Sequence, residues 1–161
     1  MDTLRIADTF RRGVYVFEIS NIEIRPMTIE DYDKVFEMWQ ITTKRALSEA
    51  DSRENIEFYL KRNPNMSQVA LSEGMVVGTV LCGHDGRRGF IHHMAVRPEY
   101  RRHNIAKRMA RRALDALSND GINKTHIFCY TDNGLGQSFW TAMGWKQRDD
   151  VFVYSYQSDE L

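Results

Sequence analysis

Five short stretches of the chain are rich in the residues typical of β-strands, and two of them, residues 22–26 and 67–83, alternate between apolar and polar positions. The predicted strands are, in order, residues 22–26, 67–83, 90–96, 124–131 and 151–156. The second stretch turns at Glu73-Gly74 and is therefore expected to be a hairpin. The third is apolar or histidine at almost every position, which is typical of a central strand covered on both faces.

Apolar residues recur with helical spacing in four other stretches. The first helix begins after Thr28, a residue able to cap it, and the others cover residues 45–62, 101–118 and 136–143. Strands and helices therefore follow one another as β-α-α-β-β-β-α-β-α-β. This order predicts an α/β (α+β) three-layer domain built on a mixed sheet.

Length and composition indicate one globular domain. The 161 residues include 42% hydrophobic and 27% charged side chains, the usual mixture of a protein with a packed core. The clear pattern begins at residue 22, so we expect residues 1–21 to be an N-terminal extension and residues 22–161 to form the domain. The longest apolar run is four residues, against the roughly 20 that span a membrane. Residues 1–13 lack the apolar core of a secretory signal, and a cytoplasmic protein is expected.

The stretch with the clearest chemistry is residues 92–106, HHMAVRPEYRRHNIA. It combines the end of a strand, a turn and the start of a basic helix. Such a junction offers unpaired backbone N–H groups and the positive end of the helix dipole to an anion. Arg101, Arg102, Lys107 and Arg108 add positive charge, so a pyrophosphate is the expected ligand.

These residues resemble the motif of the GNAT superfamily of N-acetyltransferases, whose cofactor is acetyl-CoA. Met94-Ala95-Val96-Arg97-Pro98 matches the strand end of that motif, and residues 101–106 match its R/Q-x-x-G-x-G/A loop. A second landmark of the family, N-x-x-(A/G)-x-x-x-Y-x-x-x-G-F, is matched at Asn133, Gly136, Trp140, Gly144 and Trp145. The resemblance covers residues 22–156 and includes the order of strands and helices.

The resemblance implies an enzyme that transfers an acetyl group from acetyl-CoA to a primary amine by direct attack of the amine on the thioester. It also implies a mostly antiparallel sheet, flanked by helices and splayed at its central strands. A backbone N–H near Val96 would then stabilise the developing oxyanion. The cofactor-binding residues that the resemblance implies are Met94, Ala95, Val96, Arg101, Arg102, His103, Asn104, Ile105, Ala106, Lys107, Asn133 and Trp140.

Two positions depart from the family pattern. Asn104 stands where the first loop glycine is expected, and asparagine tolerates left-handed backbone better than other non-glycine residues. Trp140 stands where many members have a tyrosine that protonates the leaving thiolate. An indole N–H cannot supply that proton, so either the thiolate leaves unaided or another group helps.

Two adjacent strand histidines are the candidates for a general base. His92 lies four residues before Val96, the position of a catalytic histidine in the arylalkylamine branch of the family. Neighbouring strand residues point to opposite faces, so His92 is expected to share a face with Met94 and Val96, and His93 to point away. His92 is therefore the preferred base and His93 the second candidate. Two rings on opposite faces cannot share a metal, and no metal is expected.

Other interpretations stay open at this point. The six Lys and Arg of residues 101–112 would also suit a nucleic-acid-binding helix, although 22 basic and 22 acidic residues balance over the chain. The departures at Asn104 and Trp140 also fit a CoA-binding sensor without catalysis. His84-Asp85 would suit a base and its orienting acid, but an Asp before Gly86 is typical of a turn.

The acceptor is not specified by the sequence. A small-molecule amine and a protein amino group both fit, as do a monomer and a homodimer, whereas no nucleic acid or membrane is expected as a partner. The acidic residues of 49–57 lie where the family places the helices that cover the acceptor. Their charge favours a cationic small amine.

Overall fold

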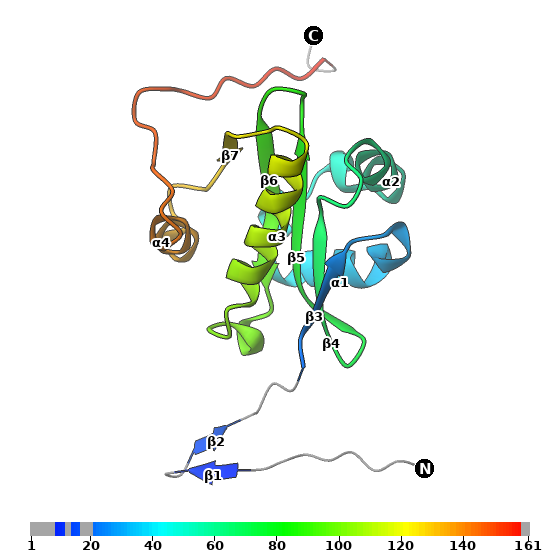
Figure 1. The fold of residues 1–161 in the computed structure, drawn as a ribbon, viewed down its shortest axis with the longest axis vertical. Coiled ribbons are helices and arrows are strands. Elements are labelled where there is room, and N and C mark those ends of the chain that lie inside the picture. Colours follow the sequence, from blue (N-terminus) through cyan, green and yellow to red (C-terminus); the bar gives the residue numbers. More distant parts are fainter. Residues whose placement is uncertain (1–8, 12–13, 17–20, 159–161) are drawn as a thin grey trace. The chain divides into compact units, whose positions relative to one another are not determined.

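A computed structural model describes residues 9–11, 14–16 and 21–158 of the chain. Its main feature is a five-stranded sheet with the order β3-β4-β5-β6-β7 (Figure 1). The strands are Glu23–Pro26 (β3), Gln68–Ser72 (β4), Met75–His84 (β5), Gly89–Val96 (β6) and Thr125–Ile127 (β7). Neighbouring strands run antiparallel except β6 and β7, which run parallel. This confirms the predicted mixed, mostly antiparallel sheet.

Helices cover both faces of the sheet and complete three layers. α1 (Tyr32–Thr42) and α2 (Arg53–Arg62) lie on one face, and α3 (Ile105–Asn119) crosses the other (Figure 1). Trp39 of α1 and Leu117 of α3 are completely buried against the two faces. Burial of one large apolar side chain contributes about 1.5–3 kcal/mol, so these two layers stabilise the sheet from both sides.

Polar contacts fix the point at which α1 begins. The Asp31 carboxylate, at the end of the short 3-10 turn Ile29–Asp31 (η1), accepts a hydrogen bond of 2.9 Å from the backbone N–H of Thr28. Arg25 of β3 donates two more, of 2.8 and 2.7 Å, to the same carboxylate. Burial by itself would raise the pKa of Asp31, but Arg25 and Thr28 outweigh it and hold this pKa below its usual value.

The single helix predicted over residues 45–62 is not formed. Two 3-10 turns, Lys44–Ala46 (η2) and Glu49–Asp51 (η3), come before α2. Leu47 between them has extended backbone with ψ of 136°, and Ser48 caps η3 with its side chain. Because such a cap gives the backbone an alternative to continuing the helix, the chain restarts at α2.

The helix predicted over residues 101–118 begins four residues later than expected. It is preceded by the 3-10 turn Pro98–Tyr100 (η4) and by a loop. Arg102 and Asn104 in this loop have left-handed backbone, with φ of 66° and 59°. Residues in that conformation cannot belong to a right-handed helix, so α3 starts at Ile105.

The sheet splays between β6 and β7, as expected. The two strands pair only where Gly89–Ile91 lie beside Thr125–Ile127. Beyond Ile91, no described residue forms a strand on that edge of β6. The end of β6 that carries Val96 therefore has an open edge.

The chain divides into two compact units, Met1–Phe128 and Cys129–Leu161, each described by itself. The second unit contains α4 (Gly134–Ala142), close to the predicted helix. The prediction of a strand over residues 151–156 is wrong, because these residues have no regular secondary structure. A stretch with strand composition forms a strand only where a neighbouring strand satisfies its backbone hydrogen bonds.

Within the predicted extension, β1 (Thr9–Arg11) and β2 (Val14–Val16) form a separate antiparallel hairpin. No helix in the described part of the chain has both the length and the apolar character needed to cross a membrane.

Candidate active site

Strand β6 carries one extra residue opposite β5. The pairs Thr79–Ala95 and Leu81–His92 leave one residue of β5 facing two of β6, which is a β-bulge. His93 lies in the bulge and has left-handed backbone with φ of 44°. Histidine is among the non-glycine residues that adopt this conformation more often than most.

The bulge brings both histidine rings to the face of the sheet that α1 and α2 cover. His93 stacks on Trp39 of α1, with ring centroids 4.5 Å apart, and His92 meets the ring of Tyr59 of α2 at 6.5 Å. The prediction that these two rings point to opposite faces is therefore wrong. An extra residue shifts the alternation of a strand by one position, and the sequence pattern does not show where this happens.

Val96 faces the other side of the sheet. It pairs with Gly78, where an added Cβ would lie 2.9 Å from Met109 of α3. His92 consequently does not share a face with Val96, which corrects a second expectation. Met94, the second residue of the bulge, is half-buried.

Both ring nitrogens of His93 have polar neighbours. Nε2 lies 2.8 Å from Oδ1 of Asp51, and Nδ1 lies 3.2 Å from Oγ1 of Thr43. The side chains of His93 and Asp51 are only 6% and 8% exposed. The second oxygen of Asp51 accepts a hydrogen bond of 2.8 Å from the backbone N–H of Ser48. A ring held in this way is better suited to fixing the strand than to taking a proton from a substrate.

The ring of His92 has a different environment. It is exposed, lies between Tyr59 and Phe90, and makes no hydrogen bond with any described residue. The neighbouring side chains remove part of the water around the ring, and this partial desolvation lowers the pKa of His92 below its usual value of 6.5. The charge of His93 lowers this pKa further, whereas that of Asp51 opposes the shift. His92 is therefore neutral near pH 7 and has a nitrogen that can accept a proton.

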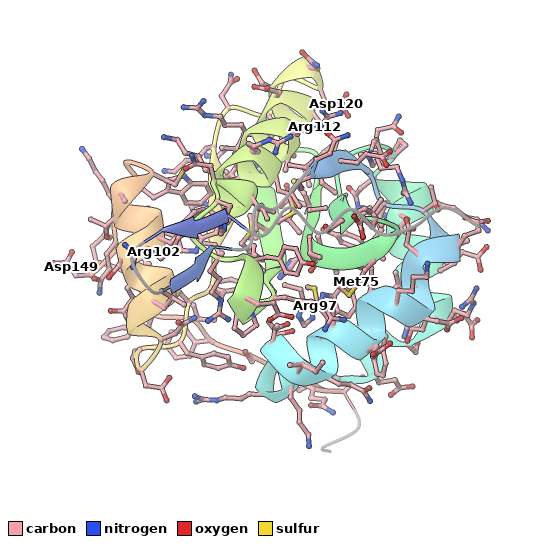
Figure 2. All side chains as sticks on the ribbon, turned by 90° about the horizontal axis from the view of Figure 1, so that it is seen from below. Met75, Arg97, Arg102, Arg112, Asp120 and Asp149 are labelled. Carbon is pink, nitrogen blue, oxygen red and sulfur yellow. The ribbon has the colours of Figure 1, made fainter. Side chains whose placement is uncertain are left out.

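The backbone of Val96 is directed toward the open edge of β6. The N–H of Arg97, labelled in Figure 2, donates to the carbonyl of Val77 on β5 at 2.8 Å. Neighbouring residues of a strand direct their backbone groups to opposite sides, so those of Val96 point away from β5. Its carbonyl accepts a hydrogen bond of 3.1 Å from Nε of Arg101. Its N–H points the same way and suits an extended ligand or a developing oxyanion.

The start of α3 offers backbone donors to an anion. The first bond of the helix runs from the N–H of Arg108 to the carbonyl of Asn104, at 3.0 Å. The N–H groups of Ile105, Ala106 and Lys107 therefore precede the helical ladder, and the Asn104 side chain makes no capping hydrogen bond. Three such donors at the positive end of a 15-residue helix form a site that fits a pyrophosphate.

Positive side chains surround this helix start. Arg102, in the loop, and Lys107, in the first turn of α3, are both exposed. Arg112 lies further along α3 and away from Arg102, as Figure 2 shows. Nε of Arg112 donates a hydrogen bond of 3.3 Å to Oε1 of Gln68, so this side chain is directed to β4 and not to the start of α3. Nδ1 of His103 lies 2.7 Å from the backbone carbonyl of Arg101 and must donate to it.

Asn133 and Trp140 belong to the second unit. Oδ1 of Asn133 accepts a hydrogen bond of 2.9 Å from the N–H of Gly136 and caps α4. The ring of Trp140 packs against that of Trp145, with centroids 4.6 Å apart. The second landmark is thus a capped helix followed by an aromatic contact.

The sequence did not reveal that Asp51 and Thr43 are partners of His93. Ser48 and Asp51 have the spacing of a capping box, which marks a turn at this point. No pattern indicates that this turn reaches β6, because 42 residues separate Asp51 from His93.

His84 and Asp85 do not form a pair. Nε2 of His84 lies 3.3 Å from Asp120, and Oδ1 of Asp85 accepts from the N–H groups of Arg87 and Arg88, as in an ordinary turn. No cluster of three His, Cys, Asp or Glu that could hold a metal occurs among the described residues.

Comparison with known proteins identifies the family. The sequence profile of the acetyltransferase (GNAT) family matches residues 30–145, well over half of the chain. The chain therefore belongs to this family. It is an acetyl-CoA-dependent N-acetyltransferase, and amines are its acceptors.

An acetyltransferase of Sodalis glossinidius is 29% identical over 133 residues, which cover 82% of this chain and 92% of that protein. The structure of the N-acetyltransferase PaiA of Thermoplasma acidophilum, solved with coenzyme A, is similar with a TM-score of 0.69 at 22% sequence identity. The match covers 80% of this chain and 92% of the PaiA chain. The structure of AAC(6')-Iy, solved with the bisubstrate analogue CoA-S-monomethyl-acetylneamine, is similar with a TM-score of 0.66 at 18% sequence identity. The match covers 86% of this chain and 99% of the AAC(6')-Iy chain. These two structures share the fold of this chain.

Proposed function

We propose that this chain acetylates a primary amine beside β6, with His92 as the general base. The observation that carries this proposal is the state of the His92 ring, which is exposed and makes no hydrogen bond with the described residues. Its lowered pKa leaves the ring neutral near pH 7, as a base requires. It belongs to the strand whose open edge ends at Val96.

Acetyl-CoA fits the loop that opens α3. The N–H groups at the helix start and the cations of Arg102 and Lys107 suit its pyrophosphate. The backbone at the end of β6 suits its pantetheine amides, which would pair like an added strand. The proposed cofactor residues are Met94, Ala95, Val96, Arg101, Arg102, His103, Asn104, Ile105, Ala106, Lys107, Asn133 and Trp140.

Acetyl-CoA supplies an activated thioester. The amine nitrogen bonds to the thioester carbonyl carbon, the carbon–sulfur bond breaks, and the proton of the amine passes to His92. The N–H of Val96 stabilises the negative charge that develops on the carbonyl oxygen. Trp140 gives no proton to the departing thiolate, which leaves as an anion because its pKa is that of an ordinary thiol.

The proposed acceptor is a small cationic amine, and a protein amino group is the alternative. Glu49 and Glu54 lie exposed on η3 and α2, so negative charge is present on this segment. Asp51, in contrast, is occupied by His93. The proposal also takes residues 22–161 as the acetyltransferase domain with residues 1–21 outside it, and it is compatible with a monomer or a homodimer.

The test is release of free CoA thiol from acetyl-CoA with a panel of amines. We expect release with at least one amine, and we expect His92→Ala to lower kcat by about 10²–10⁴-fold without changing the affinity for CoA. The wild-type rate should fall as the pH drops through the lowered pKa of His92, below pH 6.5, because the protonated ring cannot accept a proton.

Two results would contradict the proposal. If CoA binds but no amine causes thiol release, the chain is a CoA-binding sensor. If His92→Ala and His93→Ala cause equal and small losses, the base is a water molecule or the substrate itself.

A further inference from the structure

We propose that Asp51 and His93 act as a pair that holds the β6 bulge and tunes His92, so that both are positioning residues of the reaction. We call them the Asp51–His93 pair. The inference rests on the proposed role of His92 as the base.

The first argument is the number of contacts that hold His93 in an unfavourable backbone conformation. A non-glycine residue with φ of 44° persists only where its surroundings fix it. The ring stacks on Trp39 and lies within hydrogen-bond distance of Asp51 and Thr43. The backbone carbonyl of His93 also accepts a hydrogen bond of 3.0 Å from Oγ1 of Thr79. Both ring nitrogens and the backbone carbonyl of His93 therefore have partners that hold the bulge.

The second argument is that Asp51 is itself fixed independently of His93. One of its carboxylate oxygens accepts the N–H of Ser48, and its backbone carbonyl accepts a hydrogen bond of 2.8 Å from the hydroxyl of Tyr32. The other carboxylate oxygen is therefore a fixed point for His93. Through it, the segment between α1 and α2 is attached to the strand that carries His92.

The third argument is electrostatic. His92 and the Asp51–His93 pair lie on the same face of the sheet, and the two members of the pair act on His92 with opposite signs. A protonated His93 lowers the pKa of His92, and the Asp51 carboxylate raises it. Tyr59 of α2 is the other titratable group that faces the ring, and burial raises its pKa so that it stays neutral. Phe90 on the remaining side carries no charge.

Two substitutions separate this role from a structural one. Asp51→Asn removes the negative charge but keeps the shape of the side chain. His93→Asn removes the imidazole ring, and asparagine is among the residues that best tolerate a left-handed backbone, so the bulge can be retained. Glu57→Gln is the matched control, because it also removes one charge from this region, but from an exposed ion pair with Lys61.

The measurement is the titration of the His92 ring by NMR in the full-length chain. The ring signal of His92 is assigned as the one that is missing from the spectrum of His92→Ala. The pKa of His92 should fall in Asp51→Asn, rise in His93→Asn and stay unchanged in Glu57→Gln. The acid limb of the kcat profile should move in the same directions. We also expect His93→Asn to lower kcat on the order of 10-fold with an unchanged KM for acetyl-CoA, because the base is displaced.

Each outcome decides the matter. Opposite shifts in the two variants support the pair. If the pKa of His92 does not shift and the variants only have a lower melting temperature, the proposal is overturned. Shifts of this pKa in the same direction in both variants also overturn it, because the residues are then only structural. Opposite shifts that the kcat profile does not follow show that the pair tunes the His92 ring but that His92 is not the base. This outcome overturns the positioning role in the reaction separately from the effect on the ring.

Discussion

Left-handed backbone occurs at three non-glycine residues of the candidate active site, His93 in the β6 bulge and Arg102 and Asn104 before α3. Each of them turns a group toward the place where a ligand is expected. His93 redirects the strand beside His92, and the other two turn the chain so that the helix presents its N–H groups. Local strain of this kind is commonly found where a protein binds or reacts.

At Asn104 the residue conformation predicts a graded effect on CoA binding. Asn104→Gly should keep or tighten the affinity, because glycine adopts φ of 59° freely and no capping bond is lost. Asn104→Val should weaken it by about tenfold, because a left-handed L-residue costs roughly 1–2 kcal/mol. Calorimetric titration with CoA measures both variants. Equal affinity of the valine variant and the wild type would show that the turn does not matter for binding.

Between secondary-structure elements, the contact of Arg25 with Asp31 joins β3 to the start of α1. Asp31 is 7% exposed, so its removal leaves a partly buried guanidinium and the N–H of Thr28 without their acceptor. Loss of a buried charge-assisted hydrogen bond is more costly than loss of an exposed ion pair. The stability of this junction should therefore depend on the ionisation of Asp31.

We expect Asp31→Asn to lower the free energy of unfolding by roughly 2 kcal/mol at pH 7. The folded-state pKa of Asp31 lies below its usual 3.8, so its contribution is present above pH 3.8 and is lost as the pH falls through the folded value. The difference between wild type and variant should accordingly shrink below about pH 4. Urea unfolding at several pH values measures it. Asp33→Asn, which breaks an exposed pair with Arg53, is the control and should have little effect.

At the scale of the whole molecule, 22 basic and 22 acidic residues give no net charge. Two of the basic side chains on α3 form hydrogen bonds within the protein. Arg108 donates to the backbone carbonyl of Ile22, and Arg112 donates to the side chain of Gln68. A balanced chain with a local basic loop is suited to one small anion rather than to a long polyanion. This agrees with membership of the acetyltransferase family.

Saturating CoA should stabilise the full chain against heat. At 100 times its Kd, a ligand selective for the native state adds about 2.7 kcal/mol, which corresponds to a rise in Tm of roughly 5–10 °C for a chain of this size. The rise should persist at 200 mM salt, whereas any binding of an oligonucleotide should weaken steeply. No change in Tm at millimolar CoA would be inconsistent with the proposed cofactor loop.

The sequence by itself determined the features that depend on local pattern. The order of the strands from 22 to 96, the helices near 28–42 and 136–143, and the strand–loop–helix motif could all be predicted, because periodicity, caps and turn residues are local properties. The tolerance of asparagine for left-handed backbone agrees with the φ of 59° that Asn104 has in the structure. Through its motifs the sequence indicated the acetyltransferase family as well.

Only the tertiary structure decided where the histidines point and what they touch. A bulge arises from the pairing of β6 with β5, so the alternation of His92 and His93 could not reveal it. Thr43 and Asp51 reach His93 from 50 and 42 residues away, contacts that no local pattern encodes. The strand predicted over residues 151–156 failed for the related reason that a strand requires a partner and not only a pattern. Most of the elements follow from local sequence, but the environment of the proposed base follows from the packing of α1, η3 and α2 against β6.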